Sequence, residues 1–343
     1  KNLTAKVCGV ETETVEIEFP LLNTTRNAKL HLSEILLQEN HVPFKLNKFR
    51  SLEEKYQHLG DNIILIDGNN CLLRCMYNTP DKYNSKGDYV GGFIGFFFTL
   101  LKIKEIYPEY RLHVFFQQNE IQGSEKLKKA YKMNLMWCQL FVERMGYTVY
   151  SSTEEVKDNI YSFLQTRNNI QEALIYSTNE IFMSLITPQI SIYYPKITYR
   201  GNSEFITLPR INKMFGFKEG YKVKWALAFH GETEIPVKSI TDFYLEKYGP
   251  KQGKIKYVEY SSLLFNATTE EELLNSVRQD SNFSLFHDTL KENLQKLTCK
   301  KIPVTCVTGL YHSSEVIVLL EEVEMYKEIE LWDKTERIFR GLW

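Results

Sequence analysis

The sequence predicts an α/β protein built on a mostly parallel, doubly wound sheet, with a helical appendage. Two observations lead to this prediction. Short runs of β-branched and aromatic residues, typical of strands that are buried on both faces, recur five times after residue 60. Stretches with apolar residues at helical spacing separate these runs, and strands that alternate with helices form right-handed crossovers in a parallel sheet.

The predicted elements follow one another in a regular order. The strands are expected at residues 62–67, 112–116, 147–150, 173–177 and 190–194. Apolar stripes predict helices around Phe93–Leu101, over Glu125–Met145 and around Ile160–Leu164. From Tyr199 onward the pattern is helical and richer in lysine.

This order divides the chain into four expected regions. They are an N-terminal extension of unknown role at 1–59, an α/β domain at 60–200, a helical region at 201–290, and C-terminal strands with a tail at 291–343. In the last region, the runs Pro303–Thr308 and Ser314–Leu320 predict a pair of strands.

The composition excludes several classes of protein. The 343 residues include 42 Lys+Arg and 43 Asp+Glu, so nucleic acid can be contacted only through local basic patches. A hydrophobic content of 43% excludes a disordered chain. Six cysteines without a CxxC motif favour a reducing, intracellular compartment, in the cytoplasm, the nucleus or a host cell. The longest apolar run, Gly91–Leu101, is too short to cross a bilayer, so no membrane partner is expected.

A candidate site begins at Asp67, at the end of the first buried strand of the sheet. A carboxylate there costs free energy unless it is paired or binds a cation. In doubly wound sheets the ligand crevice lies at the carboxyl ends of the strands, which favours a functional role for Asp67. The alternative is that Asp67 caps the next helix.

Six segments in order resemble the flap endonuclease and 5′-nuclease family, which includes the 5′-nuclease domain of bacterial DNA polymerase I and phage 5′-exonucleases. They are IDGNN with Arg74 and NSKGDYVGGFIGFFFTLLK in 64–104, VFFQ at 114–117, KLKKAYK at 126–132, EVKD at 155–158, STNEI at 177–181 and FHGETEIP at 229–236. The resemblance implies a PIN-like 5′-nuclease fold, with a degenerate helix-hairpin-helix in 201–290.

The resemblance also implies a carboxylate cluster that holds two divalent ions for phosphodiester cleavage. This sequence keeps Asp67, Glu155 and Asp158 at the family's acidic positions. The other acidic positions are occupied by Gln117, Lys157, Asn179, Ile181, His230 and Thr233. We therefore expect an inactive residual site without a metal ion or other cofactor. If an ion binds, Asp67 and Asp158 are its expected ligands, and Mg²⁺ is the expected ion of an active enzyme.

Lys157 is the most informative of these replacements. An ammonium group about 4 Å from a divalent ion repels it by several kcal/mol even in a fairly high effective dielectric. We expect Lys157 to form an internal salt bridge, with Asp67 or Asp158, that replaces the metal. The alternative is that Lys157 lies one helical turn away and points into solvent.

Local basic segments predict contacts with DNA or RNA. The arch-like segment places an aromatic residue among lysines, which suits a single strand, and a lysine-rich segment follows the degenerate hairpin, which lacks the family's glycines. Both segments also fit an ordinary solvated surface. The expected nucleic-acid-binding residues are Arg74, Lys126, Lys128, Lys129, Tyr131, Lys132, Lys247, Lys251, Lys254 and Lys256.

The C-terminal segment RIFRGLW, residues 337–343, is aromatic at its tip. It resembles the terminal peptides with which some flap endonucleases dock on a sliding clamp, so Phe339, Leu342 and Trp343 are candidates for docking on a protein partner. The alternative is a final helix that packs on the core.

These observations favour a catalytically degenerate 5′-nuclease relative that serves as a nucleic-acid-binding or scaffolding subunit. Its expected setting is viral or phage nucleic-acid metabolism, with a protein partner in a replication, transcription or processivity complex. Two alternatives stay open. One is an active structure-specific 5′-nuclease with a reduced metal site, and the other is a protein-interaction module without a nucleic-acid role.

Overall fold

A computed structural model gives the fold of the chain. It describes residues 61–119, 121–195, 204–231, 235, 237, 239–243, 246 and 262–341, and the backbone of three earlier strands. The chain divides into two compact units, Lys1–His58 and Leu59–Trp343. In the first unit, β1 (Lys6–Glu11), β2 (Thr14–Glu18) and β3 (Ala28–His31) form an antiparallel sheet.

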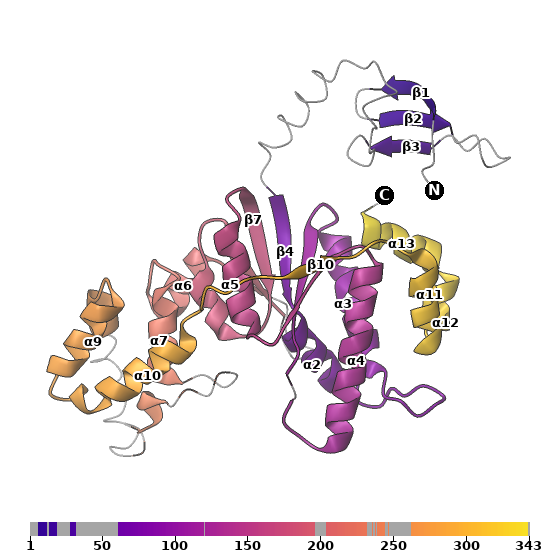
Figure 1. Cartoon of the computed structure of the whole chain (residues 1–343). Coiled ribbons are helices and arrows are strands. Elements are labelled where there is room, and N and C mark those ends of the chain that lie inside the picture. The colour runs from indigo at the N-terminus through magenta and orange to yellow at the C-terminus, as the bar shows by residue number, and fades with distance from the viewer. Residues whose placement is uncertain are drawn as a thin grey trace. The chain divides into compact units, whose positions relative to one another are not determined.

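The second unit is built around a seven-stranded sheet with the strand order β10-β6-β5-β4-β7-β8-β9 (Figure 1). Its strands are β4 (Asp61–Asp67), β5 (Arg111–Gln117), β6 (Thr148–Ser152), β7 (Ile170–Tyr176), β8 (Ile190–Tyr194), β9 (Glu204–Ile206) and β10 (Cys306–Thr308). Strands β4 to β8 pair in parallel, whereas β9 and β10 pair antiparallel at the two edges. All five predicted strands are present, and the predicted α/β fold is confirmed.

Helices cover both faces of this sheet (Figure 1). The described residues of the second unit form α-helices that include α2 (Gly68–Asn78), α3 (Gly91–Ile106), α4 (Glu125–Arg144), α5 (Val156–Thr166), α6 (Leu208–Phe215), α7 (Lys222–His230), α9 (Glu270–Gln279), α10 (His287–Leu297), α11 (Ser313–Glu322), α12 (Tyr326–Glu330) and α13 (Trp332–Arg340). The same described residues also form the 3₁₀-helices η2 (Glu180–Leu185) and η3 (Ser284–Phe286). None of the helices in the described part of the chain is long and apolar enough to cross a bilayer.

The central strand β4 separates two hydrophobic clusters. Ile64 and Ile66 belong to the cluster that α2, α3 and α4 cover, whereas Ile63 and Leu65 belong to the cluster that α5, α7 and α10 cover. All four side chains are buried, because successive residues of a strand point to opposite faces and helices pack on both. This double burial explains why the strand is a continuous apolar run in the sequence.

The turn from β4 into α2 depends on Gly68. A Cβ atom at this position would lie 2.4 Å from an atom of the Phe116 ring and 2.8 Å from the Phe115 carbonyl oxygen. Only glycine allows α2 to start so close to β5. The turn therefore fixes the start of α2 at the carboxyl ends of the strands.

A return segment, defined here as residues 298–305, connects α10 to β10 and crosses α5 (Figure 1). The Ser162 hydroxyl on α5 donates to the Lys300 carbonyl oxygen at 3.2 Å and accepts from the Ile302 amide at 2.8 Å. One buried hydroxyl thus satisfies two backbone groups of the segment and holds it against the helix.

The predicted strand over Ser314–Leu320 is wrong, because these residues lie in helix α11. Val316, Leu319 and Leu320 are buried at helical spacing against the cluster around α3 and α4. A short apolar run has no periodicity that distinguishes a strand from a buried helix, so tertiary packing decides its structure.

The C-terminal helix α13 packs on the core. Phe339 is fully buried, and its ring centroid lies 5.3 Å from that of Phe97 and 5.4 Å from that of Phe141. This burial corrects the expectation that Phe339 docks on a partner, since its ring is inside the protein. The other two docking candidates, Leu342 and Trp343, lie outside the described residues.

Replacing Phe339 by alanine should lower the free energy of unfolding by about 3–5 kcal/mol, because a large aromatic side chain leaves a cavity in a packed core. Urea unfolding measures this change. The matched control is Leu331→Ala, whose side chain is 61% exposed and should cost less than about 0.5 kcal/mol. Equal stability of the two variants would contradict the packing of α13.

Candidate functional site

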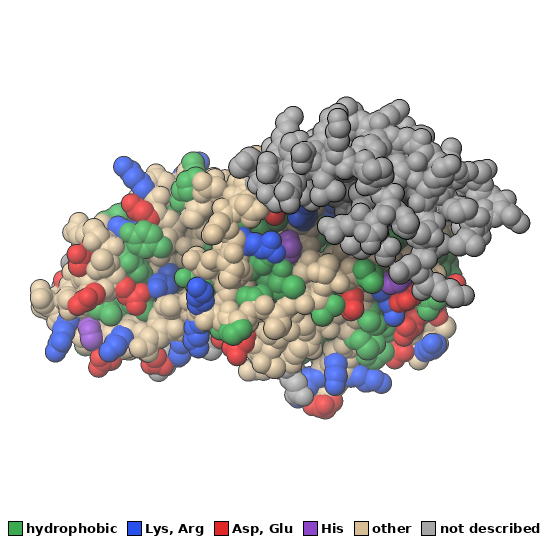
Figure 2. Space-filling model, turned by 45° about the horizontal axis from the view of Figure 1, so that its top comes forward, with side chains coloured by type: hydrophobic (Ala, Val, Ile, Leu, Met, Phe, Trp, Pro, Cys, Tyr) green, Lys and Arg blue, Asp and Glu red, His purple; other side chains and the backbone are tan. Residues whose placement is uncertain are grey.

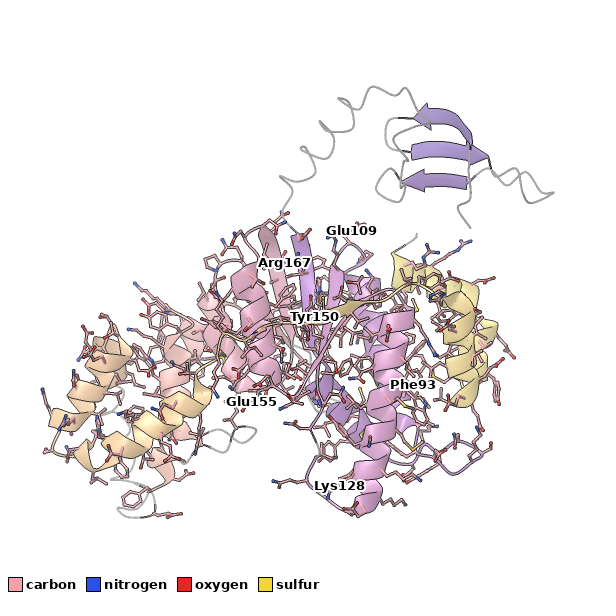
Figure 3. The ribbon with its side chains drawn as sticks, viewed as in Figure 1. Phe93, Glu109, Lys128, Tyr150, Glu155 and Arg167 are labelled. Carbon is pink, nitrogen blue, oxygen red and sulfur yellow. The ribbon has the colours of Figure 1, made fainter. Side chains whose placement is uncertain are left out.

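A cavity of about 670 Å³ opens at the carboxyl ends of β4, β5 and β7. Since parallel strands end at the same edge of a sheet, residues far apart in the sequence meet there. Of the residues predicted to form the site, Asp67, Arg74, Glu155 and Lys157 line this cavity, whereas Asp158 is buried beside it. Figure 3 shows Glu155 and Lys128 at the same end of the molecule, opposite Glu109 and Arg167.

Asp67 both caps helix α2 and forms part of the cavity wall. Its Oδ1 accepts a hydrogen bond from the Asn70 amide at 3.1 Å, and its Oδ2 accepts one from the Ser177 hydroxyl at 2.9 Å. Burial raises the pKa of Asp67 to about 6, although the two hydrogen bonds act in the opposite direction. The carboxyl group therefore titrates close to neutral pH.

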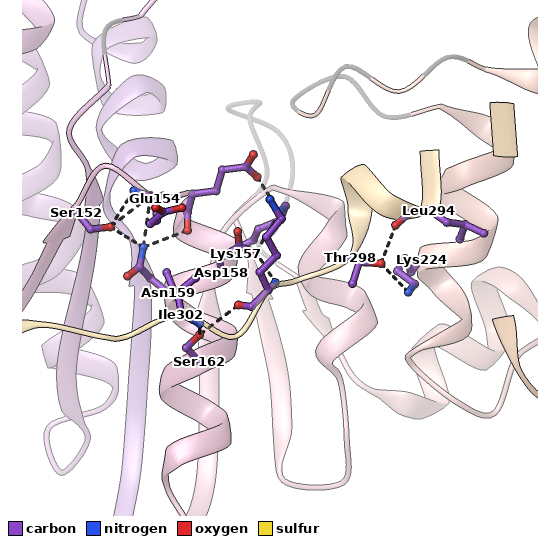
Figure 4. A network of polar contacts seen from close by, with 12 residues as sticks. Ser152, Glu154, Lys157, Asp158, Asn159, Ser162, Lys224, Leu294, Thr298 and Ile302 are labelled. Carbon is purple, nitrogen blue, oxygen red and sulfur yellow. Dashed lines mark hydrogen bonds and ion pairs between the residues drawn. The ribbon is translucent and has the colours of Figure 1, made fainter. Parts of the chain in front are cut away.

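Lys157, near the start of α5, is buried and paired with two carboxylates. Its Nζ lies 2.8 Å from Glu155 Oε2 and 3.1 Å from Asp158 Oδ1 (Figure 4). Burial by itself lowers the pKa of Lys157, but the hydrogen bonds and charges of Glu155 and Asp158 outweigh it and raise that pKa above its ordinary value. Lys157 is thus a charged ammonium group inside the site, and it does not point into solvent.

Neighbouring groups of the fold supply the hydrogen bonds and the ion pair of the Asp158 carboxylate. Besides the ammonium of Lys157, its Oδ1 accepts a hydrogen bond from the Lys300 amide of the return segment at 2.8 Å. Its side chain is only 3% exposed. A buried carboxylate with an ion pair and a backbone donor on the same oxygen stabilises the local structure, and here it ties α5 to the return segment.

Neutral hydrogen bonds connect α2, β5 and α4 beside Asp67. The Asn69 side chain donates to the Gln117 carbonyl oxygen at 2.9 Å and accepts from the Gln117 amide at 2.7 Å. The same Asn69 amide group donates to the Tyr131 hydroxyl at 2.5 Å. Tyr131 is 3% exposed, which corrects its predicted role as a surface contact for nucleic acid.

Asn179 and Ile181 follow β7 and serve the backbone and the core. Asn179 Oδ1 accepts a hydrogen bond from the Ile181 amide at 3.1 Å and caps η2. Ile181 is fully buried in the cluster around α5 and α7. This part of the site therefore has an amide and an aliphatic side chain instead of charged oxygen ligands.

The cavity residues that the structure describes do not fit a pair of divalent ions. Both oxygens of Asp67 accept hydrogen bonds, and Asp158 is paired with Lys157. In the described ranges, no group of three or more His, Cys, Asp and Glu side chains is placed to hold a metal ion. Hard cations such as Mg²⁺ need several oxygen ligands, and a buried ammonium group beside them acts against binding.

The predicted basic residues fall into three groups. Lys126, Lys129 and Lys132 are exposed on α4, whereas Lys128 pairs with Glu125 at 2.9 Å. Arg74 lines the cavity, and its buried Nε has no hydrogen-bond partner in the structure. The remaining four, Lys247, Lys251, Lys254 and Lys256, lie outside the described residues. On the face shown in Figure 2, basic and acidic side chains are interspersed.

Several cavity residues did not stand out in the sequence. Asn69, Asn70 and Thr178 contribute amide and hydroxyl groups to the wall, and Tyr77 contributes a ring. The two asparagines follow Asp67 and Gly68 in the IDGNN segment, and Thr178 belongs to the STNEI segment; these segments were their only signals. The sequence carried no signal that Tyr77 lines the cavity, because the position of its side chain depends on how α2 packs.

Comparison with known structures identifies the fold of this chain. The chain is similar to the 5′-exonuclease of bacteriophage T5 with bound zinc ions, with 12% identity over 82% of this chain and 99% of the other and a TM-score of 0.50. It has the flap endonuclease and 5′-nuclease fold. Human GEN1 in complex with Holliday junction DNA is similar too, with 12% identity over 81% of this chain and 72% of the other and a TM-score of 0.50.

This finding confirms the 5′-nuclease fold that the resemblance between sequence segments implied. No protein-family model and no curated protein sequence matches the chain. At 12% identity the likeness concerns the fold alone, and the chemistry of the site depends on its own residues.

Replacing Asp67 by asparagine should stabilise the protein at pH 7.5. The folded pKa of about 6 lies above the roughly 3.9 of an unfolded Asp, so ionised Asp67 costs the folded state free energy above pH 6. The cost fades as the pH falls toward 4. Urea unfolding over this range should show a gain of about 1–3 kcal/mol at pH 7.5 that shrinks at acidic pH. An equal gain at both ends, or a gain in the exposed control Asp81→Asn, would contradict this assignment.

Replacing Lys157 by methionine should lower the free energy of unfolding by about 3–5 kcal/mol, because Asp158 would stay buried without its cation. The double variant Lys157→Met with Asp158→Asn should recover part of this loss, since it removes the unpaired charge. Chemical denaturation of the single and double variants measures the coupling. Additive losses would show that the two side chains do not act as a buried pair.

Proposed function

We propose that this chain is a catalytically degenerate 5′-nuclease-like protein that binds nucleic acid, or serves as a scaffold, without cutting it. One observation carries this proposal: the buried ammonium of Lys157 lies 2.8 Å from Glu155 and 3.1 Å from Asp158 in the site cavity. A positive charge paired with two of the three remaining acidic residues supports loss of a two-metal reaction.

Electrostatics explains why such a site is a poor phosphodiesterase. Two-metal cleavage needs ions that activate a water molecule and stabilise the leaving oxygen. An ammonium group at about 4 Å disfavours a divalent ion by several kcal/mol. Asp67, the third acidic residue, has a raised pKa because it is buried. The internal ion pair therefore supports the fold at the expense of metal binding.

The basic groups around the cavity support contact with nucleic acid. Arg74 lines the cavity, and Lys126, Lys129 and Lys132 are exposed on α4. Since the net charge is −1, this local cluster has to supply the attraction to phosphates, and binding should depend strongly on salt. The structure of human GEN1, which shares the fold, contains Holliday junction DNA.

The setting that we propose is viral or phage nucleic-acid metabolism, with a protein partner in a replication, transcription or processivity complex. The 5′-exonuclease of bacteriophage T5 is one of the proteins with this fold.

One observation favours an active nuclease with a reduced metal site as the second candidate. Asp67 and Glu155 line the same cavity, and the Glu155 side chain is 55% exposed. Glu155 could therefore leave Lys157 and turn toward an ion, in which case Mg²⁺ would be held by these two carboxylates.

A labelled 5′-flap duplex distinguishes the candidates. Without divalent ions, the wild-type protein should bind it with an affinity that falls steeply with salt, and with Mg²⁺ or Mn²⁺ no cleavage should appear. Replacing the three exposed lysines of α4 by glutamate should weaken binding by about tenfold or more, because the contacts are with phosphates.

The matched control replaces three other exposed lysines, Lys291, Lys327 and Lys334, by glutamate, and it should bind nearly as well as the wild type. Cleavage that Asp67→Ala abolishes would establish the active enzyme instead. If the protein neither binds nor cleaves the duplex, the result would favour a protein-interaction module.

A further inference from the structure

A second cavity, of about 570 Å³, lies between α2, the loop that follows it and the start of α4. We call it the tyrosine pocket, because the rings of Tyr77, Tyr83 and Tyr89 line it together with the apolar side chains of Met76 and Leu127. Neither the sequence motifs nor the proposed salt bridge accounts for this pocket.

The walls of the tyrosine pocket are held in place by hydrogen bonds and ring contacts. The Tyr89 hydroxyl donates to carbonyl oxygens of α2 and of the residue after it, 3.0 Å from Met76 and 2.9 Å from Thr79. The rings of Tyr83 and Tyr89 meet edge to face, with centroids 5.6 Å apart. Such a preformed aromatic wall suits a flat, aromatic ligand.

The tyrosine pocket adjoins the site cavity. Leu73 and Tyr77 line both cavities, and the Tyr77 side chain is 79% exposed. Tyr77 therefore stands between an apolar pocket and a polar one. A ligand that reaches both must carry an aromatic part and a polar part within a short distance of each other.

Cationic groups lie at both ends of this pair of cavities. Lys126 Nζ lies 5.7 Å from the centroid of the Tyr83 ring, at the wall of the tyrosine pocket. Arg74, whose guanidinium group is always charged, lines the polar cavity. The polar part of the ligand should therefore be an anion.

We propose that the tyrosine pocket receives one unpaired nucleobase, with the adjoining phosphate in the polar cavity near Arg74. This inference rests on the nucleic-acid-binding function proposed above, and it names the part of the strand that the site recognises. Stacking on aromatic side chains binds unpaired bases with little sequence preference. An aromatic side chain of a peptide would fill the same pocket but would offer no anion to Arg74 or Lys126.

Fluorescence anisotropy with 5′-flap duplexes in EDTA tests this inference. Tyr77→Ala should weaken binding by about five- to thirtyfold, as expected for the loss of one stacked base. Tyr77→Trp should bind at least as tightly as the wild type. Tyr326→Ala, whose side chain is 58% exposed on α12, is the matched control and should leave the affinity unchanged.

A scan of the flap with single abasic residues makes the test independent of protein folding. At one flap position, an abasic residue should weaken binding to the wild-type protein about as much as the Tyr77→Ala substitution weakens binding to the intact flap. The Tyr77→Ala protein should bind this abasic flap almost as well as it binds the intact flap. The base pocket would be overturned, and the proposed function left standing, if Tyr77→Ala bound as tightly as the wild type. The same would follow if the abasic residue weakened binding equally in both proteins. Absence of binding by the wild type would overturn the proposed function and this inference with it.

Discussion

The pairing of Lys157 with Asp158 constrains the whole region around the strand ends. Two opposite charges buried in one place are stable only as a pair, because either one alone would lose its hydration without compensation. Asp158 also accepts a hydrogen bond from the Lys300 amide, so the pair connects α5 to the segment that returns to β10. Glu155 completes the neutralisation of Lys157 from the cavity side.

Neutral side chains hold the rest of the strand ends. Asn69 and Gln117 exchange hydrogen bonds through neutral groups, and Asn179 caps a 3₁₀-helix. Carboxylates packed together need cations to offset their repulsion, whereas amides hold the same backbone without any. The 5′-nuclease fold is thus kept at the strand ends by interactions that do not depend on a metal ion.

The arrangement leaves two adjoining cavities of different character. Amide, hydroxyl and charged groups line the one at the strand ends, and tyrosine rings with apolar side chains line the other. Their common wall, Leu73 and Tyr77, comes from α2, whose start Gly68 fixes against β5. Polar and aromatic recognition therefore meet on one helix, close to the exposed lysines of α4.

The sequence by itself determined the five central strands and the location of Asp67, because burial on both faces favours short continuous runs of β-branched and aromatic residues, and a strand end places a carboxylate in a crevice. It also indicated that Lys157 would be paired. Only the tertiary structure decided which carboxylates pair with Lys157. Adjacent residues of a helix, such as Lys157 and Asp158, are not placed side by side by the helix itself. Packing against distant elements likewise placed Tyr131 and Phe339 in the core and made 314–320 helical. Such contacts between residues far apart in the chain leave no local pattern to read.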